Sequence, residues 1–315
     1  RSRGHACRSR RLCSSGREEG ARMTAQRVRS FAIVGITYAA ALAAALLVGS
    51  SLQDGHPLLV IAAADVAATL VVFVASAVFR CASIYDPFWS VAPLAISGYW
   101  MLTTGFDLRS VIVLALIWIW GLRLTYNFLS GWPGLDHEDW RYVDLRATSG
   151  RLFPFVNLFG IHLLPTGWVY LGCLPLMGVM TSERPLGWLD APGIMVMLGA
   201  IALEARADAS LRAFRETPGR RLTDVLDSGV WGWCRHPNYL GEMGVWWGLW
   251  LVCLAAAPSL WWTGIGALSI YLLFRFISTP MIDRRHLARR PAYARLMREL
   301  PSFLPRFSGR SSGSP

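Results

Sequence analysis

Long apolar runs separated by short polar segments dominate the chain. Eight runs are long enough to cross a hydrocarbon layer of about 30 Å as helices. They cover approximately residues 31–52, 57–79, 88–105, 110–130, 155–180, 188–206, 239–257 and 259–278. The pattern predicts an all-α fold, a polytopic membrane helix bundle of about eight transmembrane helices. The run at 88–105, which contains Pro93, and the run at 188–206, whose lower end is polar, are the weakest of the eight.

Both ends of the chain are polar. Residues 1–22 are arginine-rich and precede Met23, which predicts a disordered basic extension before a transmembrane hairpin at 23–80. After the last span, the segment "DRRHLARRPAYARLMRELPSFLPRF" mixes Arg with apolar residues, a pattern typical of an interfacial helix. Residues 308–315 are expected to be a disordered tail.

The composition agrees with a membrane protein. The 315 residues are 54% hydrophobic and only 16% charged, and the mean hydropathy is +0.38. Such a balance is rare among water-soluble domains of this size. The net charge of +11 comes from arginine alone, since the chain has no lysine. These arginines lie between apolar runs and not on one solvated face, which argues against a nucleic-acid-binding protein.

Arginine placement predicts the orientation, because cytoplasmic loops retain positive charge. With the N-terminus in the cytoplasm, most loop arginines fall on the cytoplasmic side, and only Arg109 and Arg184 fall outside. We therefore expect both termini to be cytoplasmic. Loss of one weak span would invert the loops beyond it.

A charged stripe is expected in "ALEARADASLRAFR", residues 202–215. On a helix, Glu204, Asp208 and Arg215 lie within about 40° of one another. Two acids on one face gain little from anionic headgroups and instead suit hydroxyl donors or a paired Arg. The alternative is a solvated face at the end of a membrane helix, with side chains that snorkel to the surface.

A second polar group opens the stretch "GVWGWCRHPNYLGEMGVWWGLW", residues 229–250. Pro237 suits the first position of a helix, which makes His236 the expected N-cap. The helix start, Arg235 and the nearby Arg220 and Arg221 predict a site for a phosphate group. Tyr239 and Glu242 share one helical face. The alternative is that each residue acts separately, with Arg235 on lipid phosphate and Tyr239 as an interfacial anchor.

Two further charges lie at the edges of apolar runs: Asp86 in "SIYDPFWSVAPL" and Arg123 in "WIWGLRLTYNFL". Each could also be a boundary charge. The run "DHEDWRYVDLR", residues 136–146, has no second ligand pair at helical spacing, so we predict no metal site there. We expect it to be a loop organised by internal ion pairs.

Taken together, these segments resemble a known family. "GVWGWCRHPNYLGE" followed by tryptophans, preceded by "ExxAD", "DPFWSVAP" and "WGLRLTYN", is similar to the bacterial membrane family called steroid 5-alpha-reductase-like. That family belongs with the steroid 5-alpha-reductases, sterol reductases and isoprenylcysteine carboxyl methyltransferases. The resemblance covers roughly Ala82 to Phe307 and implies a catalytic membrane domain at 81–307 in a bacterial inner membrane. Reductases of this group use NADPH to reduce a carbon–carbon double bond conjugated to a carbonyl.

The resemblance also implies roles for individual residues. Asn238, Tyr239, Glu242 and Trp246 match cofactor-holding positions. The resemblance matches the stripe on residues 202–215 to a polar, an acidic and a basic position of the family, namely Glu204, Asp208 and Arg215. The steroid enzymes carry Asn at the position of Glu204. The positions that the residues and the resemblance together assign to the cofactor are Arg123, Glu204, Asp208, Arg215, Arg235, His236, Asn238, Tyr239, Glu242 and Trp246.

The catalytic positions depart from the family pattern. Asp86 lies seven residues before Pro93, as does the acid that polarises the substrate ketone in the family. The substrate-polarising Tyr of the steroid enzymes lies three residues before the Arg, where this chain has Trp120. Tyr126, three residues after Arg123, is the candidate substitute. The expected substrate is therefore a lipid-like molecule of steroid or isoprenoid type, and not a steroid in particular.

The expected function is reduction of an enone-like lipid with NADPH, with Asp86 or Tyr126 as hydrogen-bond or proton donor. The alternatives are a methyltransferase that uses S-adenosylmethionine and a noncatalytic lipid-binding membrane protein. The first alternative does not need several arginines, because its cofactor has no phosphates. Its family also tends to carry paired glutamates after the last span, where this chain has only Asp283.

Overall fold

The structure, a computed structural model, describes residues 3–305 and the side chains of residues 25–305. The described part consists of helices joined by loops and contains no β-strand, which confirms the all-α prediction. Seven segments are long and apolar enough to cross a membrane: Ala25–Ser51, Pro57–Phe79, Leu108–Gly131, Trp140–Met180, Trp188–Glu216, Pro237–Ala256 and Pro258–Arg289. The protein is therefore an integral membrane protein.

The remaining predicted span is shorter than expected. The run at 88–105 forms helix α3 (Phe88–Thr104), which has 17 residues and contains Pro93. At 1.5 Å per residue it rises about 26 Å, less than the hydrocarbon thickness. The described residues therefore contain seven long candidate spans and this short helix at the places where about eight spans were predicted. The predicted tail at 308–315 lies outside the described residues, and the predicted extension at 1–22 lies before the described side chains.

Two compact units make up the chain, and each contains two separate stretches of sequence. Unit 1 comprises Arg1–Trp89 and Phe128–Thr166, and unit 2 comprises Ser90–Asn127 and Gly167–Pro315. The functional division predicted at residue 80 stays a prediction.

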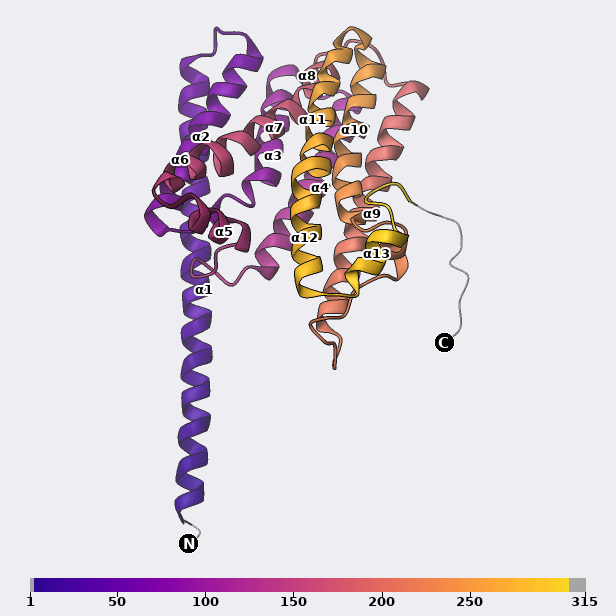
Figure 1. Ribbon diagram of the computed structural model, residues 1–315. Coiled ribbons are helices and arrows are strands. Elements are labelled where there is room, and N and C mark those ends of the chain that lie inside the picture. Colours follow the sequence, from indigo (N-terminus) through magenta and orange to yellow (C-terminus); the bar gives the residue numbers. More distant parts are fainter. Residues whose placement is uncertain (1–2, 306–315) are drawn as a thin grey trace. The chain divides into compact units, whose positions relative to one another are not determined.

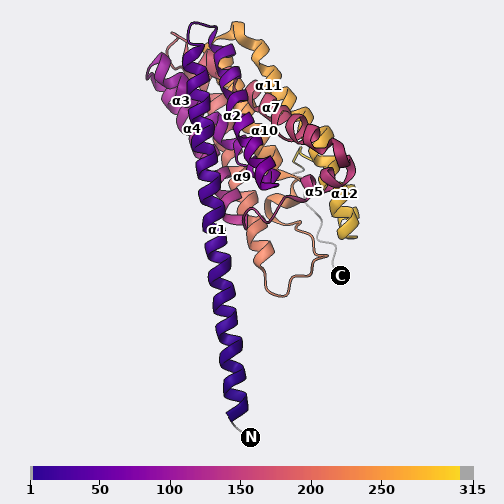
Figure 2. The ribbon, with the colours of Figure 1, turned by 90° about the vertical axis from the view of Figure 1, so that its left-hand side faces the viewer.

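Unit 1 begins with the predicted hairpin of α1 (Arg3–Ser51) and α2 (Pro57–Phe79), which lie side by side in both views (Figures 1 and 2). The start of α2 is fixed by Pro57 and by the His56 ring, whose Nδ1 accepts the backbone N–H of Leu58. Its end is fixed by Arg80, which adopts a left-handed conformation with φ 53°.

Unit 1 continues with α5 (Trp140–Ser149), α6 (Phe153–Phe155) and the π-helical segment η3 (Val156–Leu163), which packs against α2. The expectation of a loop over 136–146 is wrong from Trp140 onward, because the Asp139 side chain accepts the N–H of Arg141 and starts a helix there.

The core of unit 2 is the pair formed by α9 (Ala191–Glu216) and α10 (Pro237–Ala256), which lie side by side (Figure 1). Glycines allow this close approach. A Cβ on Gly241 would lie 2.6 Å from the Cβ of Glu204, and a Cβ on Gly248 would lie 2.5 Å from Met197 Cγ. Small residues at a helix interface let the two backbones come together. Glu204 on α9 is therefore held against the turn of α10 that carries Glu242.

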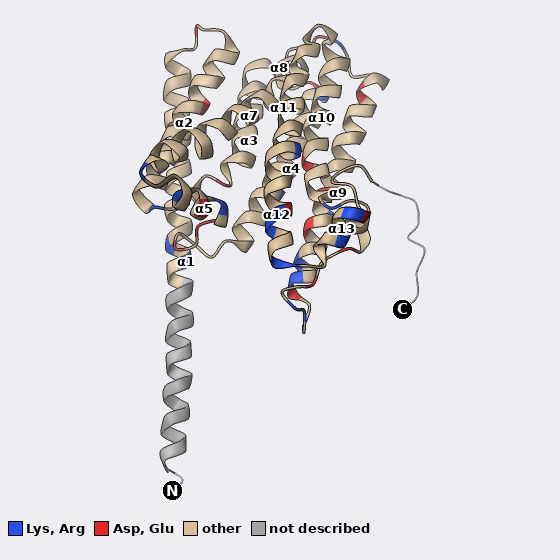
Figure 3. Ribbon diagram, viewed as in Figure 1, with Lys and Arg blue, Asp and Glu red and all other residues tan. Residues whose placement is uncertain are grey.

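Unit 2 ends in α11 (Ile265–Leu273), α12 (Thr279–Arg289) and α13 (Tyr293–Glu299). The predicted C-terminal interfacial segment is thus two short helices. On α13, Tyr293 and Leu296 are buried and pack with Leu300 and Val225. Charged residues gather at the lower ends of α9 and α12 and on α13 (Figure 3).

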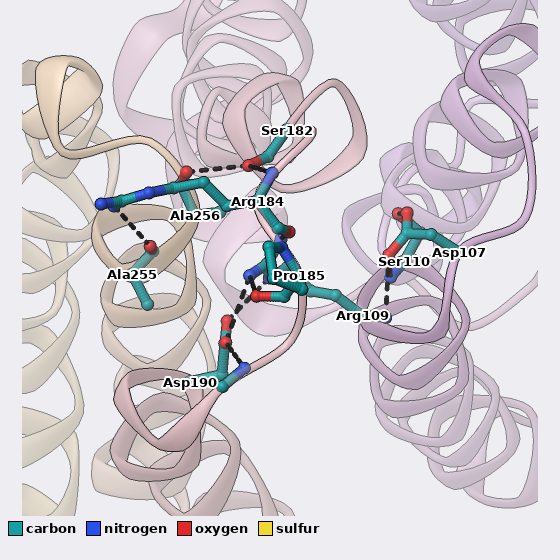
Figure 4. Close-up of polar contacts among 10 residues, drawn as sticks. Asp107, Arg109, Ser110, Ser182, Arg184, Pro185, Asp190, Ala255 and Ala256 are labelled. Carbon is teal, nitrogen blue, oxygen red and sulfur yellow. Dashed lines mark hydrogen bonds and ion pairs between the residues drawn. The ribbon is translucent and has the colours of Figure 1, made fainter.

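A buried ion pair ties α4 (Leu108–Gly131) to the start of α9 in unit 2 (Figure 4). Arg109 is 1% exposed, and its guanidinium donates to Asp190 at 2.7 Å. It also donates to the carbonyl oxygens of Arg184 at 2.7 Å and Pro185 at 3.0 Å. The prediction of orientation counts Arg109 as a loop arginine, but Arg109 is a paired charge in the interior of unit 2.

Candidate functional site

Three acids and one arginine meet in the interior of unit 2. Arg123 on α4 forms ion pairs with Glu204 at 2.6 Å and with Asp208 at 2.7 Å on α9. The Arg123 side chain is 19% exposed, and those of Glu204 and Asp208 are 4% and 15% exposed. The predicted stripe on α9 thus faces a paired Arg and not the solvent.

Asn127 extends this arrangement by one helical turn. It lies four residues after Arg123 on α4, and its amide donates to Asp208 Oδ2 at 3.1 Å. Arg212 in turn donates to Asn127 Oδ1 at 2.8 Å. Arg215, the third residue of the predicted stripe, is exposed.

The third acid is Glu242 on α10. Its carboxylate accepts the indole N–H of Trp120 and the indole N–H of Trp246, each at 3.2 Å. The two indole rings contact each other edge to face with centroids 5.3 Å apart. We call this set the acid–arginine cluster, and its members are Trp120, Arg123, Asn127, Glu204, Asp208, Glu242 and Trp246.

One guanidinium faces three carboxylates in the acid–arginine cluster, so negative charge is in excess when all three are ionised. Glu204 Oε2 is buried and has no hydrogen-bond partner among the described residues. A buried acceptor of this kind favours a ligand with N–H or O–H groups. The excess of carboxylates disfavours a phosphate at the cluster, and Arg123, which the resemblance assigns to the cofactor phosphates, is paired with two acids, although its Nε is buried and has no hydrogen-bond partner among the described residues.

A second cluster lies at the start of α10, centred on Asp283 of α12. Its Oδ1 accepts the hydroxyl of Tyr293 at 2.6 Å and lies 2.9 Å from His236 Nε2. Its Oδ2 accepts the Arg235 guanidinium at 2.9 Å, and Arg235 also donates to Leu300 O and to Ser302 Oγ. This Asp283 cluster fixes the C-terminal segment onto the start of α10.

His236 and Pro237 occupy the N-cap and the first helical position of α10, as the sequence predicts. The His236 side chain, however, binds Asp283 and caps no helix N–H. Tyr239 packs its ring on His236 and on Phe274, with centroids 5.3 and 4.5 Å apart.

Asn238 lies one turn before Glu242 on α10 and shares its face. Its Oδ1 is buried and has no hydrogen-bond partner among the described residues. It adds a second acceptor next to the acid–arginine cluster.

Four arginines of unit 2 form what we call the arginine group: Arg215, Arg220, Arg289 and Arg290. Burial lowers the pKa of Arg290, and the charges of the other three lower it further. Arg220 Nε is buried and has no hydrogen-bond partner among the described residues. An anion would neutralise this group.

In unit 1, Asp86 forms a site of its own. Its Oδ1 accepts the hydroxyl of Tyr142 at 2.5 Å, and the Arg141 guanidinium lies 3.5 Å away. Burial raises the pKa of Asp86 to about 6, although Arg141 and the Tyr142 hydrogen bond act in the opposite direction. A carboxyl group with this pKa can release or hold a proton near neutral pH.

Tyr126, the other predicted catalytic residue, is 66% exposed and forms no described contact with the acid–arginine cluster. Tyr142 was missed because it comes from a distant segment, and Asp283 was missed as a site residue for the same reason. Trp120 and Asn127 could have been found, because they lie three before and four after Arg123 on one helix.

Residues 72–299 match the family described as "Protein of unknown function (DUF1295)". The chain belongs to this family. All the residues predicted for the DUF1295 site, from Asp86 to Trp246, lie inside the matched region. The uncharacterized protein C594.04c of Schizosaccharomyces pombe is 27% identical over 250 residues, which cover 71% of this chain and 72% of the yeast protein. No solved structure matches the chain.

Proposed function

We propose that this DUF1295 protein is a membrane oxidoreductase that reduces a carbon–carbon double bond conjugated to a carbonyl in a lipid-like substrate, with NADPH as the electron donor. The proposal rests on the resemblance to the steroid 5-alpha-reductase-like family and on one arrangement in unit 2. Helix α9 carries both a buried acceptor, Glu204, and Arg215, a member of the arginine group, and the other acceptor and arginines come from other segments of unit 2.

The residues of unit 2 suit the two ends of such a cofactor. Glu204 Oε2 and Asn238 Oδ1 are buried acceptors, which fit the carboxamide N–H and ribose O–H groups. The arginine group fits the phosphates. Arg215 lies seven residues after Asp208 on the same face of α9, a rise of about 10 Å. When bound, the cofactor would supply the hydride.

The chain would contribute position and charge. Trp120 and Trp246 hold the Glu242 carboxylate in one orientation, and Arg123 pairs with both Glu204 and Asp208. In this assignment Arg123 orders the two acids and does not bind phosphate.

Asp86 is our candidate acid for the developing enolate oxygen. Tyr142, not the exposed Tyr126, orients it through the 2.5 Å hydrogen bond. Because burial raises the pKa of Asp86 to about 6, a protonated carboxyl group can donate near neutral pH.

The orientation and location are proposals of the same kind. With α3 counted as a short eighth crossing, the arginine distribution supports cytoplasmic termini, which would place the cofactor site on the cytoplasmic side. The family resemblance supports a bacterial inner membrane.

Binding of the two candidate cofactors tests the proposal. We expect purified protein in detergent to bind NADPH, and the Arg220→Ala/Arg290→Ala variant to bind it at least about 100-fold more weakly, since each of the two charge-assisted contacts contributes roughly 1.5–3 kcal/mol. Arg206→Ala is the matched control, because Arg206 is an exposed residue of α9.

No binding at millimolar NADPH would overturn the assignment. Binding of S-adenosylmethionine, insensitive to the two arginines, would favour the methyltransferase. If Glu242→Ala changes the affinity for neither NADPH nor S-adenosylmethionine, the result would favour a noncatalytic lipid-binding protein.

A further inference from the structure

A polar stripe runs along the buried face of α2 in unit 1. Asp65, Thr69 and Ser76 are 7%, 0% and 1% exposed. Spacings of four and seven residues place all three on one face of the helix. Ionisable residues inside a transmembrane helix are costly and mark functional sites more often than structural ones.

The π-helical segment η3 faces this stripe. His162, which is 0% exposed, packs its ring against Phe73 of α2 and against Tyr85, with centroids 5.5 and 4.7 Å apart. The Tyr85 hydroxyl lies 2.8 Å from Thr166 Oγ1, which lies 2.9 Å from Thr69 Oγ1. Tyr85 therefore connects η3 with the turn of α2 that follows Asp65.

Three buried atoms in this region have no hydrogen-bond partner among the described residues: Asp65 Oδ2, Asn157 Oδ1 and His162 Nε2. The His162 Nδ1 atom lies 2.8 Å from the carbonyl oxygen of Asn157. A carbonyl only accepts, so Nδ1 carries the hydrogen and Nε2 presents a lone pair. All three atoms can therefore receive a hydrogen bond from a ligand.

We propose that α2 and η3 form an intramembrane binding site for a lipid alcohol, whose hydroxyl is bound between Asp65 and His162. A hydroxyl has one hydrogen, which it can donate to His162 Nε2 while its oxygen accepts the hydrogen of the protonated Asp65 carboxyl group. An ether or a ketone offers no hydrogen to the His162 lone pair. The hydrocarbon part of the ligand would lie among apolar side chains such as Phe73.

This site does not depend on the proposed reductase function, because none of its residues belongs to the cofactor site. A π-helical turn is also the kind of helix irregularity that is frequent at functional sites.

The test uses full-length protein in detergent with two photoreactive probes of equal chain length, a long-chain primary alcohol and its methyl ether. Mass spectrometry of the labelled peptides locates the modification. We expect the alcohol to label peptides of α2 and η3 about tenfold more than the ether does, the ratio that one hydrogen bond to a charged or buried group supports.

His162→Phe keeps a ring but removes the acceptor, and we expect it to abolish the preference for the alcohol. Thr37→Val is the control: Thr37 is also buried in unit 1, and its hydroxyl already donates to Ile33 O at 2.8 Å. Melting temperatures show whether each variant is folded.

Equal labelling by alcohol and ether in the wild type would overturn the proposal and would indicate that buried water alone satisfies the three atoms. A preference that persists in folded His162→Phe would overturn it as well. The wild-type comparison decides the matter even where a variant fails to fold, and neither result affects NADPH binding in unit 2.

Discussion

Asp86→Asn provides a test in which stability and activity should change in opposite directions. Asn has nearly the same shape as Asp and carries no charge at any pH. Hydrogen bonds from Tyr142 and Ser83 and the Arg141 guanidinium 3.5 Å away all favour the ionised form of Asp86, yet burial raises its pKa to about 6. The ionised carboxylate is therefore less stable in the folded protein than in water.

The size of the effect follows from proton linkage. Below pH 3.8 the Asp86 carboxyl group is protonated in both the folded and the unfolded chain. There the raised pKa contributes its full stabilisation of the folded state, relative to a pH at which Asp86 is ionised. As pH rises through about 6, that contribution is lost. A shift of about two pKa units corresponds to about 3 kcal/mol, of which about 1.4 kcal/mol is lost between pH 5 and 7.5.

The assay is thermal unfolding in detergent at several pH values. The melting temperature of Asp86→Asn minus that of the wild type should become more positive from pH 5 to 7.5, by roughly 3–5 °C. Asp144→Asn, at an exposed position on α5, controls for the loss of one negative charge. Double-bond reduction by Asp86→Asn should fall by 100-fold or more, because general acid catalysis contributes roughly 10²–10⁴-fold.

A melting-temperature difference that stays constant across this pH range would refute the argument that burial destabilises the Asp86 carboxylate. A stable variant that keeps its activity would refute the catalytic role alone. The comparison with Asp144→Asn separates both outcomes from a general effect of charge.

Three further predictions concern unit 2. Asp190→Asn leaves the buried Arg109 without its counter-charge and should lower the free energy of unfolding by about 3–5 kcal/mol, measured by denaturant titration; an effect below 1 kcal/mol would contradict the pairing. Gly241→Leu places a side chain where Glu204 already lies and should prevent α9 and α10 from packing, visible as aggregation in size-exclusion chromatography, whereas Gly199→Leu, with open space around it, should not. Glu242→Gln replaces one of the two oxygens that accept the indole N–H groups of Trp120 and Trp246 and should weaken NADPH binding about tenfold; an unchanged affinity in a calorimetric titration would remove Glu242 from the site.

Some of the site could be predicted from local spacing. Glu204 and Asp208 are four residues apart on α9, and both pair with Arg123, as the expected polar stripe implied. The start of α10 at Pro237 was predictable because proline suits the first turn of a helix.

Other parts of the site depend on segments that are far apart in the sequence. Asp283 contacts Arg235 and His236, which lie 48 and 47 residues away in the sequence. Asp86 contacts Tyr142, which lies 56 residues away. No local pattern encodes these pairs. The exposure of Tyr126 and of Arg215 was also not readable from periodicity, because it depends on which face of each helix its neighbours cover.

The sequence by itself therefore determined that the chain is a helical membrane protein and where most spans begin and end, because hydrocarbon thickness and backbone hydrogen bonding act on each segment separately. Tertiary structure alone decided which charges are paired. Glycines at the interface of α9 and α10 bring Glu204 beside Glu242, and a polar face of α2 meets η3 around His162. Such contacts arise from packing between helices, where a carboxylate or an imidazole is stable only if another segment supplies its partner.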